Sequence, residues 1–94
     1  MMLDDYVVDV LMRDLVGHDH QPTSFLIYLW FSFEATRRRQ RVSASYQTIA
    51  DSVGVSRSTA QASVRWLLRR RLIEVEKNSP TAIPAYRVLR PWLD

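Results

Sequence analysis

A short polar stretch in the second half of the chain carries arginine and glutamine at a spacing that could read DNA bases. Arg57, Ser58, Gln61 and Arg65 stand at i, i+1, i+4 and i+8, so in a helix they share one face, with small residues between them. Arginine pairs with guanine edges and glutamine with adenine edges in the major groove, which a helix enters more deeply when its spacers are small. We therefore expect these four residues to contact bases, the alternative being a solvated helix surface.

A second group of residues could hold phosphate groups. Hydroxyl and amide side chains near helix starts donate to phosphate oxygens, and basic side chains neutralise their charge. The group comprises Ser45, Tyr46, Gln47, Ser56, Thr59, Arg41 and Lys77. Ser45 and Ser56 can also cap helices, a role compatible with phosphate contact. Partial core packing is the alternative for Tyr46, and interaction with the dipole of the preceding helix is the alternative for Arg41.

The charge of the chain is unevenly distributed, although its formal net charge is only +3. Residues 1–20 hold five acids and one base, so residues 21–94 hold twelve of the 13 bases and five of the 10 acids. Lys77 is the only lysine, and the other bases are arginines, whose planar guanidinium fits phosphates and guanine edges. Solubility and the composition bias of a GC-rich genome would also produce this excess, so charge alone does not define a partner.

Catalysis and metal binding have little support in the sequence. The chain has no cysteine, which excludes disulfides and thiolate metal sites. His18 and His20 flank Asp19, but no third or fourth ligand follows at a suitable spacing. Gly17 and Gly54 are the only glycines, too few for a phosphate-binding loop. We expect no enzyme activity, no metal and no cofactor.

The length and hydropathy of the chain predict one small domain away from membranes. Ninety-four residues can build a single core. The longest apolar run covers residues 25–33, is interrupted by Ser32 and is too short to span a bilayer. The acidic start lacks the basic residues that begin a secretion signal. We therefore expect a cytoplasmic protein.

The apolar pattern predicts four helices followed by a β-hairpin. Helices are expected at residues 4–16, 23–38, 46–53 and 56–70, and strands at 72–76 and 85–89, with Val42 in a further short strand. The second helix is apolar on nearly all sides, which is typical of a central helix or of one shared with another subunit. The predicted fold is mainly α with a small β-hairpin. It would consist of an acidic N-terminal helix with its linker, residues 1–20, and a main domain, residues 21–94.

The segment "TIADSVGVSRSTAQASVRWLLRRRLIEVE" resembles the winged helix-turn-helix domain of bacterial transcription regulators. The resemblance rests on Ile49-Ala50, Gly54-Val55-Ser56, Thr59, Leu67 and Leu72-Ile73, and extends over roughly residues 23–89. It implies a recognition helix, Ser56–Arg70, in the major groove and a wing, Lys77–Pro84, beside it. The sequence departs from the family at Arg71, where glycine is frequent, and at Ser63, which is often apolar. The wing also contains only one base, Lys77.

These observations predict a small transcription regulator that prefers particular sequences in double-stranded DNA. A homodimer formed through the N-terminal helix and the Thr23–Phe33 helix is one expectation. The alternative is that the acidic N-terminal helix lies against the arginines of its own chain and completes the core. No small-molecule effector is expected. Two alternatives stay open. The chain could be a protein–protein interaction module, because winged helices also serve that purpose. It could also be a non-specific or replication-associated DNA binder.

Overall fold

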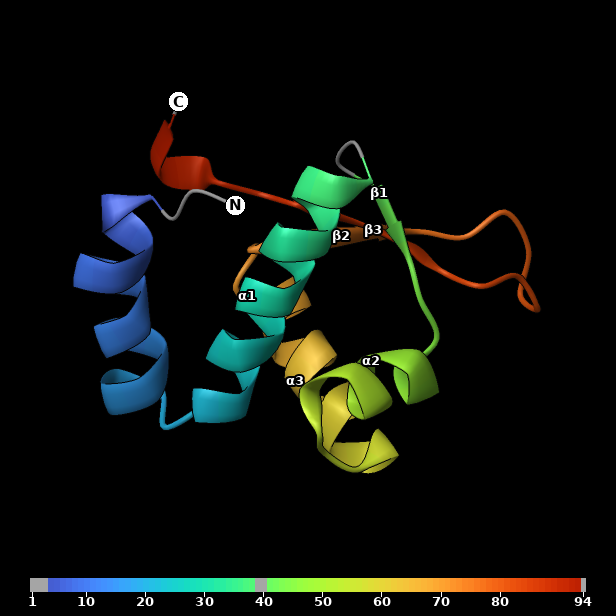
Figure 1. Ribbon diagram of the computed structural model, residues 1–94, viewed down its shortest axis with the longest axis horizontal. Helices are drawn as coiled ribbons and strands as arrows, with labels where there is room; N and C mark the ends of the chain where they lie inside the picture. Colours follow the sequence, from blue (N-terminus) through green and yellow to red (C-terminus); the bar gives the residue numbers. More distant parts are fainter. Residues whose placement is uncertain (1–3, 39–40, 94) are drawn as a thin grey trace.

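The computed structural model describes residues 4–38 and 41–93 and is mainly helical, with a small three-stranded antiparallel sheet (Figure 1). Along the chain lie two π-helical turns, η1 (Val7–Leu11) and η2 (Arg13–His18), and the helices and strands α1 (Pro22–Arg37), β1 (Arg41–Ser43), α2 (Tyr46–Val53), α3 (Arg57–Arg69), β2 (Ile73–Glu76), β3 (Ala85–Val88) and a short 3₁₀ turn, η3 (Pro91–Leu93). The expected helices and strands are therefore present, and their bounds lie within three residues of the predicted ones. The first helix differs from the prediction in its hydrogen-bond geometry.

Helix α1 occupies the centre of the molecule, as its apolar sequence predicts (Figure 1). It contacts the N-terminal segment on one side and α3 and the sheet on the other. Ile27, Tyr28 and Phe31 are fully buried, and the Tyr28 hydroxyl donates to the carbonyl of Leu89 at 3.0 Å. Burial raises the pKa of Tyr28 to about 12, so the phenol stays protonated and can keep donating. Helix α1 thus joins the N-terminal segment, α2, α3 and β3 in one core.

The N-terminal segment is helical, but its hydrogen bonds follow a wider π-helical pattern than the expected α-helix. The Met12 amide donates to the carbonyl of Val7, five residues back. Only a narrow stripe of residues spaced by four faces α1, namely Val7, Leu11 and Leu15, which are at most 5% exposed. Val8 and Met12, by contrast, are 42% and 40% exposed. Apolar side chains therefore remain on the surface of this segment.

Helices α2 and α3 form a compact pair whose boundaries follow from local sequence signals. The Ser45 side chain accepts from the Thr48 amide and the Ser56 side chain accepts from the Thr59 amide, each at 3.1 Å, so both serines cap helices as expected. Gly54 ends α2 in the left-handed conformation, with φ of 87°. The turn lets α3 cross α2 with its buried side chains, among them Ala60, Val64 and Leu67, directed to the core.

The expected hairpin is part of a sheet in the order β1–β3–β2. Val42 of β1 lies opposite Tyr86 of β3, so the short strand expected around Val42 is confirmed. In β2, Ile73 is buried against the core, whereas Glu74 is exposed and pairs with Arg87 across the strands at 3.1 Å. The loop between β2 and β3 projects from the sheet at the right of Figure 1.

The end of α3 places a non-glycine residue in a conformation that favours glycine. Arg71 has φ of 58°. Its amide donates to the carbonyl of Leu68 at 3.1 Å, and the Leu72 amide donates to that of Leu67 at 3.0 Å, which together form a Schellman motif. We expect Arg71→Gly to raise the free energy of unfolding by about 1 kcal/mol, because a side chain at positive φ is strained. Thermal unfolding should shift upward by roughly 4–8 °C for a domain of this size.

Gly54 supplies the matched control for this prediction. No heavy atom outside the glycine and its two chain neighbours lies within 4 Å of a Cβ built at this position, so Gly54→Ala tests the backbone conformation without a steric clash. It should lower the free energy of unfolding by about 1 kcal/mol, the opposite sign to Arg71→Gly. If both substitutions changed stability in the same direction, backbone strain at Arg71 would be the wrong explanation.

Candidate nucleic-acid interface

The outward face of α3 brings together most of the residues expected to read bases. Arg57, Ser58 and Arg65 are exposed, while Gln61 is half-buried at the edge of the same face. Ala62 lies exposed between them and adds little bulk. The opposite face is fixed by burial, because the inward side chains of α3 pack against α1 and α2. The row of arginines is therefore held by the core on a regular helix.

Arg69 belongs to this row, although the sequence-based site did not include it. It is exposed and follows Ala62 by seven residues and Arg65 by four, which places it on the same face one turn later. Its guanidinium carbon lies 5.4 Å from the centre of the Trp66 ring, a cation–π contact that limits its motion. The helical spacing alone could have identified Arg69.

The charges of this row are not neutralised by neighbouring acids. Within residues 4–38 and 41–93, the arginines that form ion pairs are Arg37, Arg38, Arg41, Arg70 and Arg87. Arg57, Arg65 and Arg69 are not among them, and α3 itself contains no acid. Asp51 is the only acid in α2, where it accepts from Gln47 at 2.8 Å. Three free guanidinium groups along one helix can hold phosphates or guanine edges.

The helix starts around this row expose further hydrogen-bonding groups. Ser56 and Thr59 are exposed at the start of α3, where the Ser56 hydroxyl also bonds to the Thr59 hydroxyl at 2.8 Å. Gln47 is exposed on α2 and Ser45 is half-buried. The first amides of α3 add the positive end of the helix dipole. These groups could contact phosphates on either side of a groove occupied by α3.

Three of the expected phosphate contacts have other partners in the structure. Tyr46 is half-buried and packs on the core next to Tyr86, whose pKa is raised first by burial and then by Tyr46. Arg41 forms an ion pair with Glu76 at 3.0 Å, and Lys77 donates to the carbonyl of Pro80 at 3.3 Å. All three side chains would have to exchange these contacts for phosphate. The loop between β2 and β3 thus presents little free positive charge.

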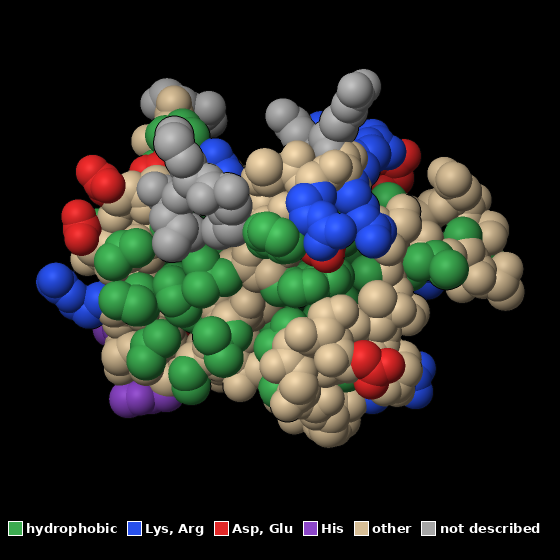
Figure 2. Space-filling model, viewed as in Figure 1, with side chains coloured by type: hydrophobic (Ala, Val, Ile, Leu, Met, Phe, Trp, Pro, Cys, Tyr) green, Lys and Arg blue, Asp and Glu red, His purple; other side chains and the backbone are tan. Residues whose placement is uncertain are grey.

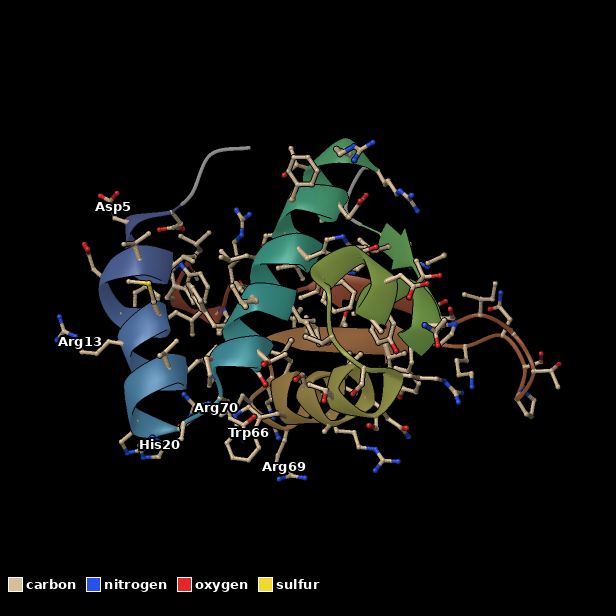
Figure 3. The ribbon with its side chains drawn as sticks, turned by 60° about the horizontal axis from the view of Figure 1, so that its bottom comes forward. Asp5, Arg13, His20, Trp66, Arg69 and Arg70 are labelled. Carbon is tan, nitrogen blue, oxygen red and sulfur yellow. The ribbon has the colours of Figure 1, made fainter. Side chains whose placement is uncertain are left out.

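The carboxyl-terminal end of α3 is attached to the acidic N-terminal segment (Figure 3). Arg70 forms ion pairs with Asp14 and Asp19, and the Trp66 indole nitrogen donates to Asp19 at 3.1 Å. The Asp19 side chain is only 6% exposed, and His18 also bonds to it at 3.0 Å. His18 and Asp19, two of the three residues considered as metal ligands, are therefore engaged in this group of contacts. The contacts of Asp19 join the end of α3 to the N-terminal segment. Trp66 packs within the chain, as expected.

The contact at Asp19 predicts a stability loss in acid. Burial alone would raise the pKa of Asp19, but the hydrogen bonds from His18 and Trp66 and the charge of Arg70 outweigh it and lower the pKa below 3.8. A lowered carboxyl pKa stabilises the fold above the unfolded value and loses that contribution as the pH falls through the folded value. We therefore expect Asp19→Asn to lower stability at pH 7 and to flatten the acid slope below about pH 4.

Urea unfolding of both proteins at pH 7 and at several values down to pH 3 would measure this effect. Trp66→Phe, which keeps a ring but lacks the indole N–H, should produce a smaller change in the same direction. Equal acid slopes for the native chain and Asp19→Asn would contradict the assignment.

The remaining described residues offer no competing site of comparable charge. At the end of α1, Arg37 and Arg38 both pair with Glu34, at 3.6 and 3.3 Å. No three metal-ligating side chains gather anywhere in the described part of the chain. Among the same residues, none of the helices has the length and apolar character needed to cross a bilayer.

Comparisons with other proteins do not assign the chain to a class. No family model, no curated protein and no solved structure matches it. The case for a function therefore rests on the geometry and charge of the residues themselves.

Proposed function

We propose that this chain is a winged helix-turn-helix protein that binds double-stranded DNA with a preference for certain sequences, as a small transcription regulator would. In this proposal α2 and α3 form the helix-turn-helix and α3 lies in the major groove. The loop Lys77–Pro84 is the wing beside it. The observation that carries the proposal is the row of Arg57, Arg65 and Arg69. These side chains are exposed, form no ion pair within residues 4–38 and 41–93, and lie on a helix packed against the core.

The arrangement around Gly54 supports this proposal. Helix α2 is short, ends in a left-handed glycine and packs directly on α3. Ala50 and Ala60 are both fully buried, so small residues lie where the two helices approach. A recognition helix has to stand clear of its supporting helix in this way before its outer face can enter a groove. Burial on one side and exposed arginine on the other satisfy that requirement.

The charge pattern divides the expected contacts into two kinds. Arg57 and Arg65 would select bases, because their side chains are exposed on the outward face, and Gln61 would assist from its edge. Ser56, Thr59 and the amides at the start of α3 would hold phosphates and set the register of the helix. Affinity would come mainly from phosphate neutralisation and would fall as salt is raised. The wing would contribute little, because Lys77 is its only base.

Selection from a random duplex library at about 150 mM salt tests the proposal, because affinities are meaningful only at a stated salt concentration. Titration of the enriched duplex and of a scrambled duplex gives the specificity ratio. Enrichment of one motif supports a sequence-preferring regulator. Equal binding to both duplexes would leave a non-specific DNA binder, and the absence of binding would favour a protein-interaction module.

A further inference from the structure

The surface of the N-terminal segment and α1 carries an unusual share of exposed apolar side chains. Of the ten large apolar side chains exposed in the described residues, seven lie between positions 6 and 33: Tyr6, Val8, Val10, Met12, Val16, Leu26 and Phe33. Figure 2 shows hydrophobic side chains gathered over the N-terminal segment and the neighbouring part of α1, at the left of that view. We call the portion formed by Val8, Met12, Val16 and Leu26 the apolar face. Contiguous exposed patches of this kind often mark interaction sites.

A shallow hollow lies at the centre of this surface, where Met12 and Val16 approach Phe25 and Leu26. Its volume of about 520 Å³ falls in the range of ligand pockets, roughly 300–1,000 Å³. Ligand pockets, however, combine apolar walls with a few convergent polar groups. Apart from Arg13 at its edge, the side chains around this hollow are apolar. A shallow, open and almost uniformly apolar surface suits a protein partner better than a small molecule.

The charges beside the apolar face indicate which partner fits. Asp5, Asp9 and Arg13 follow one another at intervals of four along the N-terminal segment, all exposed. Arg13 also borders the hollow, and it has no acidic partner within residues 4–38 and 41–93. The side chains of Asp5 and Arg13 point outward, away from the rest of the domain (Figure 3). The edge of the apolar face is thus acidic at one end and basic at the other.

We infer that the apolar face binds a second copy of this chain through a two-fold axis near Met12. A two-fold axis perpendicular to the segment reverses its direction in the second copy. Asp9 of each copy then lies opposite Arg13 of the other, and the stripe of Val8, Met12 and Val16 packs on itself. A parallel arrangement would instead place like charges together. The same surface is therefore complementary to itself in one orientation, in charge as well as in hydrophobicity.

Light scattering coupled to size exclusion measures this association without DNA, so its outcome is independent of the proposed function. Loading the chain over concentrations from about 1 µM to 1 mM detects dissociation constants within that range. The mass should rise towards twice the 11.0 kDa of one chain. Met12→Glu should hold it at 11.0 kDa, whereas Ile83→Glu, on the exposed wing, should dimerise like the native chain. Circular dichroism would show that both variants are folded.

Charge reversal tests the orientation of the two copies. Asp9→Arg and Arg13→Asp should each weaken dimerisation by about five- to tenfold, because like charges then face each other at the edge of the interface. The double variant should restore dimerisation, and an equal mixture of the two single variants should form a heterodimer. Asp51→Arg, on α2, is the control for an added charge and should have no effect. A native mass of 11.0 kDa at all concentrations, or no rescue by the double variant, would overturn the inference.

Discussion

Replacing Arg57 and Arg65 together by alanine should reduce affinity for the selected DNA by roughly a hundredfold. Each arginine that pairs with a base edge contributes about 1–3 kcal/mol of discrimination. Both side chains are exposed, and neither forms an ion pair within the described residues, so their removal should leave the fold intact. Fluorescence anisotropy with the enriched and scrambled duplexes would measure the change. The specific duplex should lose more affinity than the scrambled one.

The control is Arg87→Ala combined with Arg90→Ala, which removes the same charge from exposed positions outside α3. A hundredfold loss of affinity in this control would mean that net charge, and not the α3 row, determines binding.

The salt dependence of binding separates two roles of the α3 arginines. If they hold phosphates, the slope of log affinity against log salt should fall by about 0.9 for each phosphate that is no longer neutralised, equally on both duplexes. If they read bases, the preference at one position each should relax.

Arg69 offers a sharper test of the structure. Its place in the row follows from the helical spacing, and its contact with Trp66 holds the guanidinium over the indole ring. Arg69→Lys keeps the charge but removes the planar guanidinium, which stacks on aromatic rings and forms bidentate hydrogen bonds. A loss of affinity in Arg69→Lys comparable to that in Arg69→Ala would assign Arg69 a geometric role beyond its charge.

Leu15→Ala should lower the free energy of unfolding by about 2–5 kcal/mol, the range observed when buried leucine is replaced by alanine. Leu15 is fully buried and lies in the same core cluster as Tyr28 and Phe31 of α1. The total stability of a domain is only about 5–15 kcal/mol, so this single change would remove a large part of it. Urea unfolding monitored by tryptophan fluorescence would measure the loss.

Ile83→Ala is the matched control for this prediction, because it removes the same number of carbon atoms from a side chain that is 65% exposed. It should change stability by less than about 0.5 kcal/mol. A loss below about 1 kcal/mol for Leu15→Ala would show that the N-terminal segment contributes little to the core. The ring of Tyr6 stacks on that of Trp92 at 4.5 Å, and the Trp92 indole donates to Asp4. These contacts give a second reason to expect that the segment unfolds together with the domain.

The sequence alone determined the helical pair and the strands, because their signals are local. Ser45 and Gly54 bound α2 at the predicted residues, since a cap and a left-handed glycine act within one turn of helix. Likewise, the alternation of Ile73, Glu74 and Val75 defined β2, because successive side chains of a strand face opposite sides. The outward face of α3 was predicted for the same reason. Apart from Ser63, its inward residues are apolar at helical spacing, and its outward residues are mostly polar.

The tertiary structure decided which charges are free and which apolar side chains are covered. Arg70 and Arg69 are adjacent in sequence, yet only Arg70 meets the acids Asp14 and Asp19, which lie some 50 residues away along the chain. The π-helical turns likewise left Met12 exposed, although its spacing from Leu15 is that of a buried helical face. Such outcomes depend on how distant segments pack. A sequence pattern that extends over a few neighbouring residues does not show which distant residues of the chain will contact them.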